Sequence, residues 1–332
     1  MFRTFTFAIV ACLIASAPWG GDAVAQETIR LRITSQLPAA APLSRGLELW
    51  KQRMEQAGKG RVKVETYHNS QLYKDAEAFP AVQSKSIEMG LVVSGQFSAY
   101  DPVFGIFDLP GLFQSYDQAV RAANGNVGKV LTERLHKLGV HPLYWPQQGF
   151  VEIATTRRPL QSPADFRGLK LRTHSKELAR MAQLLGAAPT VIAAAEVSTA
   201  LSRGTVDGIT TSISSFHSRK WYESAPNVTT SHFGLVALVI VINKAVWDGL
   251  PPDIRAAAIE AARAADQYST ENVIKEEQEI IANLRKANVQ VTQFGDKARE
   301  DFTRIAAPMY DEYFKAAGPA GKELVDYVRS LK

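Results

Sequence analysis

The sequence predicts an α/β protein of two domains joined by one long helix. Strand and helix patterns alternate in two separate sets, one between residues 29 and 93 and one that starts near Gly149. A helical pattern with no internal proline or glycine runs from Pro252 to about Ala287. At about 1.5 Å per residue this helix spans ~50 Å, which is longer than one small domain needs, so we expect it to join two domains.

The first set predicts a parallel sheet. A strand pattern at Ile29 to Thr34 is followed by Leu43, Leu47, Trp50 and Met54, which share one helical face. A half-buried strand, a helix and an apolar strand follow at Arg61 to Tyr67, Asp75 to Ser84 and Met89 to Val93. The β-α-β-α-β order is typical of parallel strands covered by helices.

The second set predicts another sheet. Its candidate strands are Phe150–Thr155, Leu169–Thr173, Thr190–Ala193 and Val206–Thr210, and its candidate helices are Lys176–Leu185 and Ala195–Ser202. Gly186 suits the end of the first of these helices. Leu235 to Ile242 is uniformly apolar but too short to span a bilayer, so we interpret it as a fully buried strand. From Lys297 to Lys332 we expect two helices separated by Gly318 and Pro319.

Residues 1–25 have the features of a cleavable signal peptide. Arg3 precedes an apolar stretch, and Ala23-Val24-Ala25 fits a small-x-small cleavage site. A membrane anchor and a lipoprotein, with Cys12 in a loose lipobox, are the alternatives, but the apolar run is short and continues past Cys12. If the segment is removed, the chain keeps no cysteine, which excludes disulfides and thiol chemistry.

The remaining chemistry argues against nucleic acid binding and offers no enzyme motif. The formal charge is +5, with both signs mixed along the chain and no basic tract. There is no GxGxxG, Walker A, HExxH or GxSxG motif, and the six histidines form no metal-ligand pair at helical spacing. We therefore expect no cofactor and no metal, although catalytic groups also assemble from distant residues.

Arg172 is the most informative single residue. It stands near the end of the apolar strand in Gly168-Leu169-Lys170-Leu171-Arg172. In open α/β sheets ligands bind at the carboxyl ends of strands, and a guanidinium there can hold a carboxylate through two parallel hydrogen bonds. The spacing alone leaves a surface arginine or an inter-domain ion pair equally open.

Several segments together resemble the solute-binding proteins of tripartite ATP-independent periplasmic (TRAP) transporters, the DctP family. They are GRVKVETYHNSQL (60–72), AVQSKSIEMGLVVSG (81–95), FGIFDLPGLF (104–113), GFVEIATTRRPLQSPADFRGLKLRT (149–173), EVSTALSRGTVDG (196–208), SRKWYE (218–223) and NKAVWDGLPPDIR (243–255). The resemblance implies a periplasmic binding protein of the Venus-flytrap type, not an enzyme. It also implies that Arg172 grips a ligand carboxylate, and that a monomeric receptor delivers an organic acid to a membrane permease.

From the resemblance we expect a first domain of residues 26–148 and 237–276, and a second of 149–236 and 277–305. The helices of 306–332 should pack back on the first domain. By position we expect these further ligand contacts: Gln36, Tyr73, Ser94, Gln96, Gln148, Ser175 and Thr211. For each of them a local structural role is nearly as plausible as ligand contact.

Four departures from the family pattern favour a monocarboxylate over a dicarboxylate. Val151 stands where many members have a second arginine, and Thr211 stands where many have an asparagine. Residues 193–195 are all alanine where an aromatic is common, and His174 replaces a frequent proline. Fewer cations and a smaller side chain should suit a single carboxylate with a larger or more apolar remainder, such as a keto, hydroxy or aromatic acid. A receptor that feeds a sensor kinase and a secreted enzyme are the competing functions.

Overall fold

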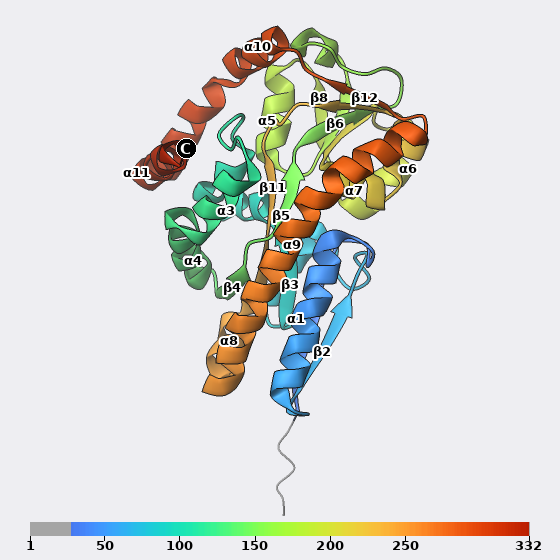
Figure 1. Ribbon diagram of the computed structural model, residues 1–332. Helices are drawn as coiled ribbons and strands as arrows, with labels where there is room; N and C mark the ends of the chain where they lie inside the picture. Colours follow the sequence, from blue (N-terminus) through green and yellow to red (C-terminus); the bar gives the residue numbers. More distant parts are fainter. Residues whose placement is uncertain (1–27, 332) are drawn as a thin grey trace, which may run out of the picture.

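Two β-sheets, each flanked by helices, form the core of the protein in the computed structural model, which describes residues 28–331 (Figure 1). The first sheet has the strand order β2-β1-β3-β11-β4, with β5 pairing to β11. The second has the order β12-β10-β6-β9-β7-β8. No helix in this described range is both long and apolar enough to cross a membrane.

The first sheet confirms the predicted order and adds an unexpected antiparallel strand. Its strands are β1 (Ile29–Thr34), β2 (Val62–Tyr67), β3 (Met89–Val93), β4 (Val140–Tyr144), β5 (Gln147–Phe150) and β11 (Leu235–Asn243). Strands β1, β2 and β3 are parallel, as expected, but β11 runs antiparallel to β3 and to β4. The fully buried β11 is an inner strand that pairs with β3, β4 and β5, and the parallel arrangement predicted for residues 29–93 is confirmed by β1, β2 and β3.

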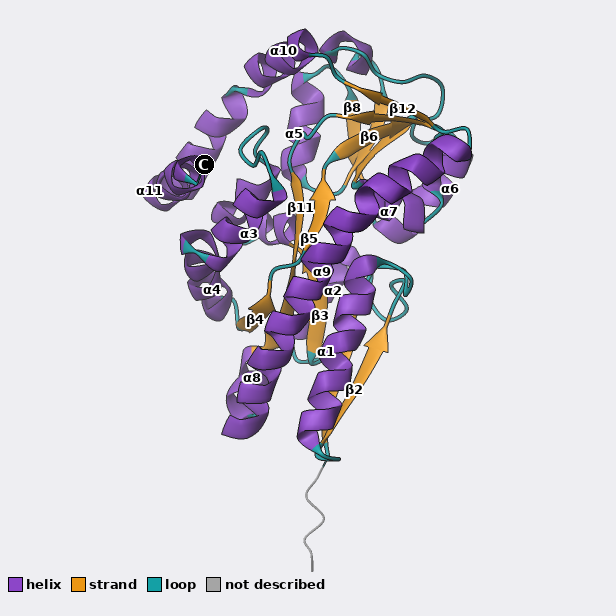
Figure 2. Ribbon diagram, viewed as in Figure 1, coloured by secondary structure: helices purple, strands orange, loops and turns teal. Residues whose placement is uncertain are grey.

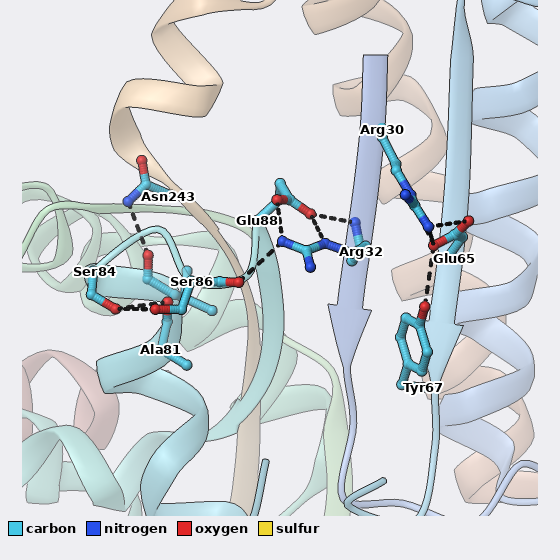
Figure 3. Close-up of polar contacts among 10 residues, drawn as sticks. Arg30, Arg32, Glu65, Tyr67, Ala81, Ser84, Ser86, Glu88 and Asn243 are labelled. Carbon is cyan, nitrogen blue, oxygen red and sulfur yellow. Dashed lines mark hydrogen bonds and ion pairs between the residues drawn. The ribbon is translucent and has the colours of Figure 1, made fainter. Parts of the chain in front are cut away.

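Helices cover both faces of the first sheet. They are α1 (Pro42–Gly58), α2 (Asp75–Gln83), α3 (Tyr116–Asn124), α4 (Asn126–Lys137) and α8 (Lys244–Gly249), with the short 3-10 helices η1 (Ser94–Ala99) and η2 (Pro102–Asp108). An ion pair between Arg30 and Glu65 links β1 to β2, and one between Arg32 and Glu88 links β1 to the residue that precedes β3 (Figure 3). Solvent screens both pairs, because each is at least partly exposed, so neither contributes much to stability.

The second sheet carries the predicted arginine strand near one edge. Its strands are β6 (Glu152–Thr155), β7 (Lys170–Thr173), β8 (Ala188–Val191), β9 (Gly208–Thr211), β10 (Asn227–Thr230) and β12 (Gln290–Gln293). The helices beside it are η3 (Pro163–Phe166), α5 (Lys176–Leu184), η4 (Ala194–Glu196), α6 (Val197–Ser202), α7 (Ile213–Ser218) and η5 (Trp221–Glu223). Strand β7 is parallel to both β8 and β9.

Three predicted boundaries shift for identifiable reasons. The strand expected at 150–155 is divided at Val151, because this residue bonds to Phe233 and Gly234 while the chain crosses from one sheet to the other. Strand β8 begins two residues early, since Gly186, with φ of +82°, ends α5 and returns the chain directly to the sheet. Strand β9 begins two residues later than expected, since Asp207 is held at the start of β7, where its carboxylate accepts a hydrogen bond from the Lys170 amide.

The long helix α9 (Pro252–Lys286) spans both sheets, as predicted (Figure 2). Its first half lies against α1, where Trp50 donates a hydrogen bond to the Ala258 carbonyl, and its second half lies against α7 and β12. The tail forms α10 (Asp296–Ala306) and α11 (Pro308–Ser330), with an additional break at Ala307 and a kink at Gly318. Helix α11 packs on η2, α3 and α4, while the exact domain boundaries stay a prediction.

The contact between α1 and α9 depends on a glycine. A Cβ atom at Gly46 would lie 2.0 Å from the Ser269 hydroxyl and 3.1 Å from the Ala265 carbonyl oxygen. We predict that Gly46→Ala lowers the free energy of unfolding by about 1–3 kcal/mol, because overpacking outweighs the gain in helix propensity. Urea unfolding measures the change.

Two further variants identify the cause. Gly46→Ala combined with Ser269→Ala should be more stable than Gly46→Ala alone, because the hydroxyl contact is relieved. Gly249→Ala serves as control, since a Cβ there meets no atom within 4 Å. Equal stability of Gly46→Ala and the wild type would contradict the close-packing argument.

A buried carboxyl ties the two crossing segments together. Glu152, 1% exposed, accepts hydrogen bonds from the Ser231 amide and hydroxyl and from the His232 amide. Burial raises the pKa of Glu152 from 4.5 to about 8, although these donors act to lower it. Between these two values the native state keeps a proton that the unfolded chain has lost, so Glu152 contributes stability that disappears as the pH rises.

We predict that the pH dependence of stability between about pH 5 and 8 is shallower in Glu152→Gln than in the wild type. The slopes should differ by up to about 1.4 kcal/mol per pH unit, the value for one proton. Urea unfolding at several pH values measures both slopes. Glu65→Gln is the control, because Arg30 holds the pKa of the exposed Glu65 near 2 and leaves it ionised throughout this range. Identical slopes for Glu152→Gln and the wild type would refute the prediction.

Candidate ligand-binding site

A small cavity lies where strand ends from the two sheets meet. Gln36 follows β1, Val93 ends β3, Arg172 lies on β7, and Thr211 ends β9. Side chains of both sheets line the cavity, which measures about 30 Å³. Carboxyl ends of parallel strands are the usual ligand position in open α/β sheets, so this cavity is the candidate site.

Arg172 is buried and held by neutral acceptors. Its side chain is 3% exposed, its Nε donates to the Ile192 carbonyl at 2.8 Å, and its Nη1 donates to the Thr210 carbonyl at 3.1 Å. Burial lowers the pKa of Arg172 to about 10, which still leaves it charged at neutral pH. Carbonyl groups orient the guanidinium but do not neutralise it, and no carboxylate between residues 28 and 331 forms an ion pair with it.

A second guanidinium, partly buried, faces the same cavity. Arg219, directly after α7, donates from Nη2 to the Gln36 carbonyl at 2.6 Å and from Nε to the Ser215 hydroxyl at 3.2 Å. Burial lowers its pKa to about 10 as well. The Trp221 ring lies 5.3 Å from the Arg219 guanidinium and 5.9 Å from that of Arg172, so one aromatic face supports both cations.

Among residues 28–331, Asp75 is the only acidic residue that lines the cavity. It begins α2, and its Oδ2 accepts a hydrogen bond from the Ala194 amide of the opposite domain at 3.0 Å. With the Gln36 amide oriented to donate, its nitrogen lies 2.6 and 2.9 Å from the two Asp75 oxygens. His174 is neutral, because burial and Arg172 lower its pKa to about 3. Two guanidinium groups and one carboxylate leave one positive charge without a counter-charge.

The structure brings half of the predicted site residues together. Gln36, Gln148, Arg172 and Thr211 line the cavity. Gln96 and Ser175 line a neighbouring cavity instead, and the Ser175 hydroxyl caps α5 by accepting from the Leu178 amide at 3.2 Å. Which of these residues touch a ligand stays a prediction.

Two predicted contacts lie outside both cavities. The Ser94 side chain is completely buried at the start of η1. Tyr73 precedes α2 and packs, half-buried, against the apolar cluster beneath that helix. Val151 is also buried in the core, so the position of the second family arginine does not reach the cavity in this chain.

Arg219 was not predicted from the sequence, and Asp75, His174 and Trp221 had no predicted ligand contact. The segment SRKWYE at 218–223 contains both Arg219 and Trp221, so the signal was present, although no spacing rule connects it to Arg172. Asp75 has the pattern of an ordinary acidic first-turn residue, and only the fold shows that it faces the opposite domain.

Other parts of the described chain offer weaker sites. A wider groove of about 980 Å³ lies between α11, α10 and residues 110–115. Its cations, Arg299 and Arg329, are exposed, and Arg329 already lies over the Tyr310 ring at 5.1 Å. Within residues 28–331 no group of three or more histidine, cysteine or acidic side chains is arranged to hold a metal ion.

Sequence comparisons identify the relatives of this chain. Residues 33–317 match the profile of the family described as bacterial extracellular solute-binding protein, family 7, or DctP. The C4-dicarboxylate-binding periplasmic protein DctP of Rhodobacter capsulatus is 32% identical over 299 residues, which are 88% of this chain and 88% of that protein. The 2,3-diketo-L-gulonate-binding periplasmic protein YiaO of Escherichia coli is 29% identical over 280 residues, 84% of this chain and 85% of that protein.

Solved structures share the fold. The sugar acid binding protein DctPAm of Advenella mimigardefordensis, in complex with galactonate, superimposes with a TM-score of 0.89 at 25% identity, over 92% of this chain and 99% of that one. A TRAP periplasmic solute-binding protein from Roseobacter denitrificans with bound β-D-glucuronate superimposes with a TM-score of 0.86 at 25% identity. This match covers 91% of this chain and 100% of that one. The match covers both sheets and the long helix, and it confirms the two-domain periplasmic binding protein fold. This chain belongs to the DctP family, the non-enzymatic periplasmic solute-binding proteins of TRAP transporters.

Proposed function

We propose that this protein captures a small monocarboxylate between its two domains, with Arg172 as the anchor, and delivers it to the membrane subunits of a TRAP transporter. The receptor would reach the periplasm through a signal peptide at residues 1–25, which lie outside the described residues, and would act as a monomer. The observation that carries the proposal is the positive charge left over in the cavity, where Arg172 and Asp75 are buried and Arg219 is partly buried.

An uncompensated buried cation is costly, and one anion removes the cost. Transfer of a charge from water into a poorly polarisable interior is strongly unfavourable unless the charge is paired. One carboxylate on Arg172 would balance the three charged side chains of the cavity. A second carboxylate would replace an excess positive charge by an excess negative one beside Asp75. The charge balance therefore favours a monocarboxylate.

The named ligands of relatives are consistent with a carboxylate. The solved relatives from Advenella and Roseobacter hold galactonate and β-D-glucuronate, and each of these acids carries one carboxyl group. The Rhodobacter relative is named for C4-dicarboxylates, so the family includes both classes. In this chain the cavity's own charges favour the first class.

Ligand capture requires the domains to separate and close again, because a cavity of about 30 Å³ is closer in size to a water molecule than to an organic acid. Contacts between the domains hold the closed form. Asp75 accepts from the Ala194 amide, Arg219 donates to the Gln36 carbonyl, and Lys176 donates to the Ser98 carbonyl at 2.6 Å. At the rim, Lys74 and Glu196 form an exposed ion pair at 2.6 Å. An anion that neutralises Arg172 would shift the population towards this closed form.

We predict that Arg172→Gln abolishes most of the carboxylate affinity. Loss of the charged partner of a buried carboxylate costs about 2–5 kcal/mol, which corresponds to a ~30- to 4,000-fold weaker Kd. Calorimetric titration of ligand-stripped protein with a panel of mono- and dicarboxylic acids measures the loss.

The matched control is Arg203→Gln, in the same domain, because Arg203 is exposed and does not line the cavity. It should bind like the wild type. Thermal unfolding without ligand checks that both variants fold. Unchanged affinity in a folded Arg172→Gln variant would refute the anchor, and a panel in which only dicarboxylates bind would refute the monocarboxylate class.

We also predict that Asp75→Asn shifts the preference towards dicarboxylates, because it raises the excess charge of the cavity by one. Succinate and its monoamide, succinamate, differ by a single charge at nearly constant shape. The wild type should be stabilised more by succinamate, and Asp75→Asn should raise the ratio of succinate to succinamate affinity at least about tenfold. Thermal shifts at millimolar ligand report both affinities, since only binding to the native state raises Tm. An unchanged ratio would contradict the charge balance.

A further inference from the structure

A second cavity adjoins the candidate site. It measures about 230 Å³ and, like the first, lies between the two domains. Phe79, Pro80 and Tyr100 of the first domain line one side, and Val191 at the end of β8 lines the other. The cavity is therefore assembled from both domains, like the charged cavity beside it.

The walls of the second cavity are apolar and partly exposed. Phe79 is buried and meets the Tyr100 ring edge-to-face, with ring centroids 4.8 Å apart. Tyr100 is 49% exposed and Val191 is 58% exposed, which places both among the most exposed large apolar side chains of the described residues. Such surface is unfavourable in water, so an apolar group placed against it would be stabilised in proportion to the area it buries.

His174 is the shared wall of the two cavities. His174 lines both of them, and two consecutive residues at the start of α2 divide between them, with Asp75 in the first cavity and Ala76 in the second. The Nδ1 atom lies 3.5 Å from the Thr210 hydroxyl, whereas the buried Nε2 atom has no hydrogen-bond partner among the described residues. Gln96, which lines the second cavity, also has a buried atom, Oε1, without a hydrogen-bond partner among the described residues.

We propose that the second cavity receives the apolar tail of the ligand, so that the substrate class is a monocarboxylic acid with a polar group next to the carboxylate and an aromatic-sized apolar tail. This inference rests on the proposed function, because the carboxylate must sit on Arg172 for the tail to point past His174. The space is sufficient, since an apolar cavity of about 150 Å³ is known to hold benzene. The unpartnered Nε2 of His174 would bond to an oxo or hydroxyl group on the carbon beside the carboxylate.

The three alanines at residues 193–195 also support a ligand with a large tail. Ala194 lines the charged cavity, and its side chain is a single methyl group. A large side chain there would occupy the space around Asp75 and Arg172, close to where the two cavities adjoin. Tyr100 and Val191 are accordingly specificity-determining residues for the tail, and His174 is one for the polar group.

Phenylpyruvate and pyruvate test the tail, since they share the oxo acid and differ by the phenyl ring. Calorimetric titration of the wild type should give a Kd about ten- to a hundredfold lower for phenylpyruvate, the gain expected for burying one ring. Tyr100→Ser and Val191→Ser should each weaken phenylpyruvate several-fold and leave pyruvate unchanged. Ile259→Ser is the control, because Ile259 is 43% exposed on α9 and lines neither cavity.

His174→Leu tests the polar contact with a second pair of probes. It should reduce the affinity for phenylpyruvate to that for 3-phenylpropionate, which lacks the oxo group, and should leave 3-phenylpropionate unchanged. A loss of both affinities by the same factor would show that His174 only supports the fold, and would overturn its role.

The outcomes separate this inference from the proposed function. If phenylpyruvate binds no better than pyruvate, or if Tyr100→Ser and Val191→Ser leave phenylpyruvate unaffected, the tail cavity is refuted. The anchor then still stands if another monocarboxylate such as glucuronate binds the wild type and not Arg172→Gln. If no acid of any class binds the wild type, the proposed function itself fails.

Discussion

One positive charge without an internal partner governs how the cleft is built. Arg172 and Arg219 lie within reach of the same small cavity, and Asp75 balances only one of them. Carbonyl oxygens and the Trp221 ring hold the two guanidinium groups in place, and neither feature cancels their charge. A protein that buries such an excess is most stable when closed around an anion. The same unpaired charge therefore determines which ligands bind and how favourable domain closure is.

The rest of the fold keeps this charge at the junction of the two domains. The helix α9 packs on α1 at one end and on α7 at the other, so both domains share one rigid element. The crossing segments at Val151 and at 231–234 are bound to each other, and Glu152 adds three hydrogen bonds there. The crossing segments that connect the two domains are therefore held together by hydrogen bonds. Such a connection suits a rotation of one domain against the other about a fixed axis.

Local patterns predicted the elements of this structure well, and the long-range arrangement less well. Hydrophobic periodicity located α1 and α9, and the apolar strand before Arg172 pointed to its place at a sheet's carboxyl edge. The antiparallel direction of β11 and the division at Val151 depend on where the chain crosses between sheets, which no local pattern encodes. The same holds for the site: Arg219 is 47 residues from Arg172 in the sequence, and only the fold brings the two under one aromatic ring.

The rim and the interior of the cleft respond differently to dissolved ions. Lys74 and Glu196 are each about half exposed, so mobile ions screen their attraction and its contribution to closure is small. The charges on Arg172 and Asp75 are shielded from solvent once the domains meet, and added salt reaches them poorly. If Arg172 holds the acid as proposed, the affinity for a captured acid should depend little on the ionic strength of the periplasm, while the rate at which anions first approach the open cleft should depend on it strongly.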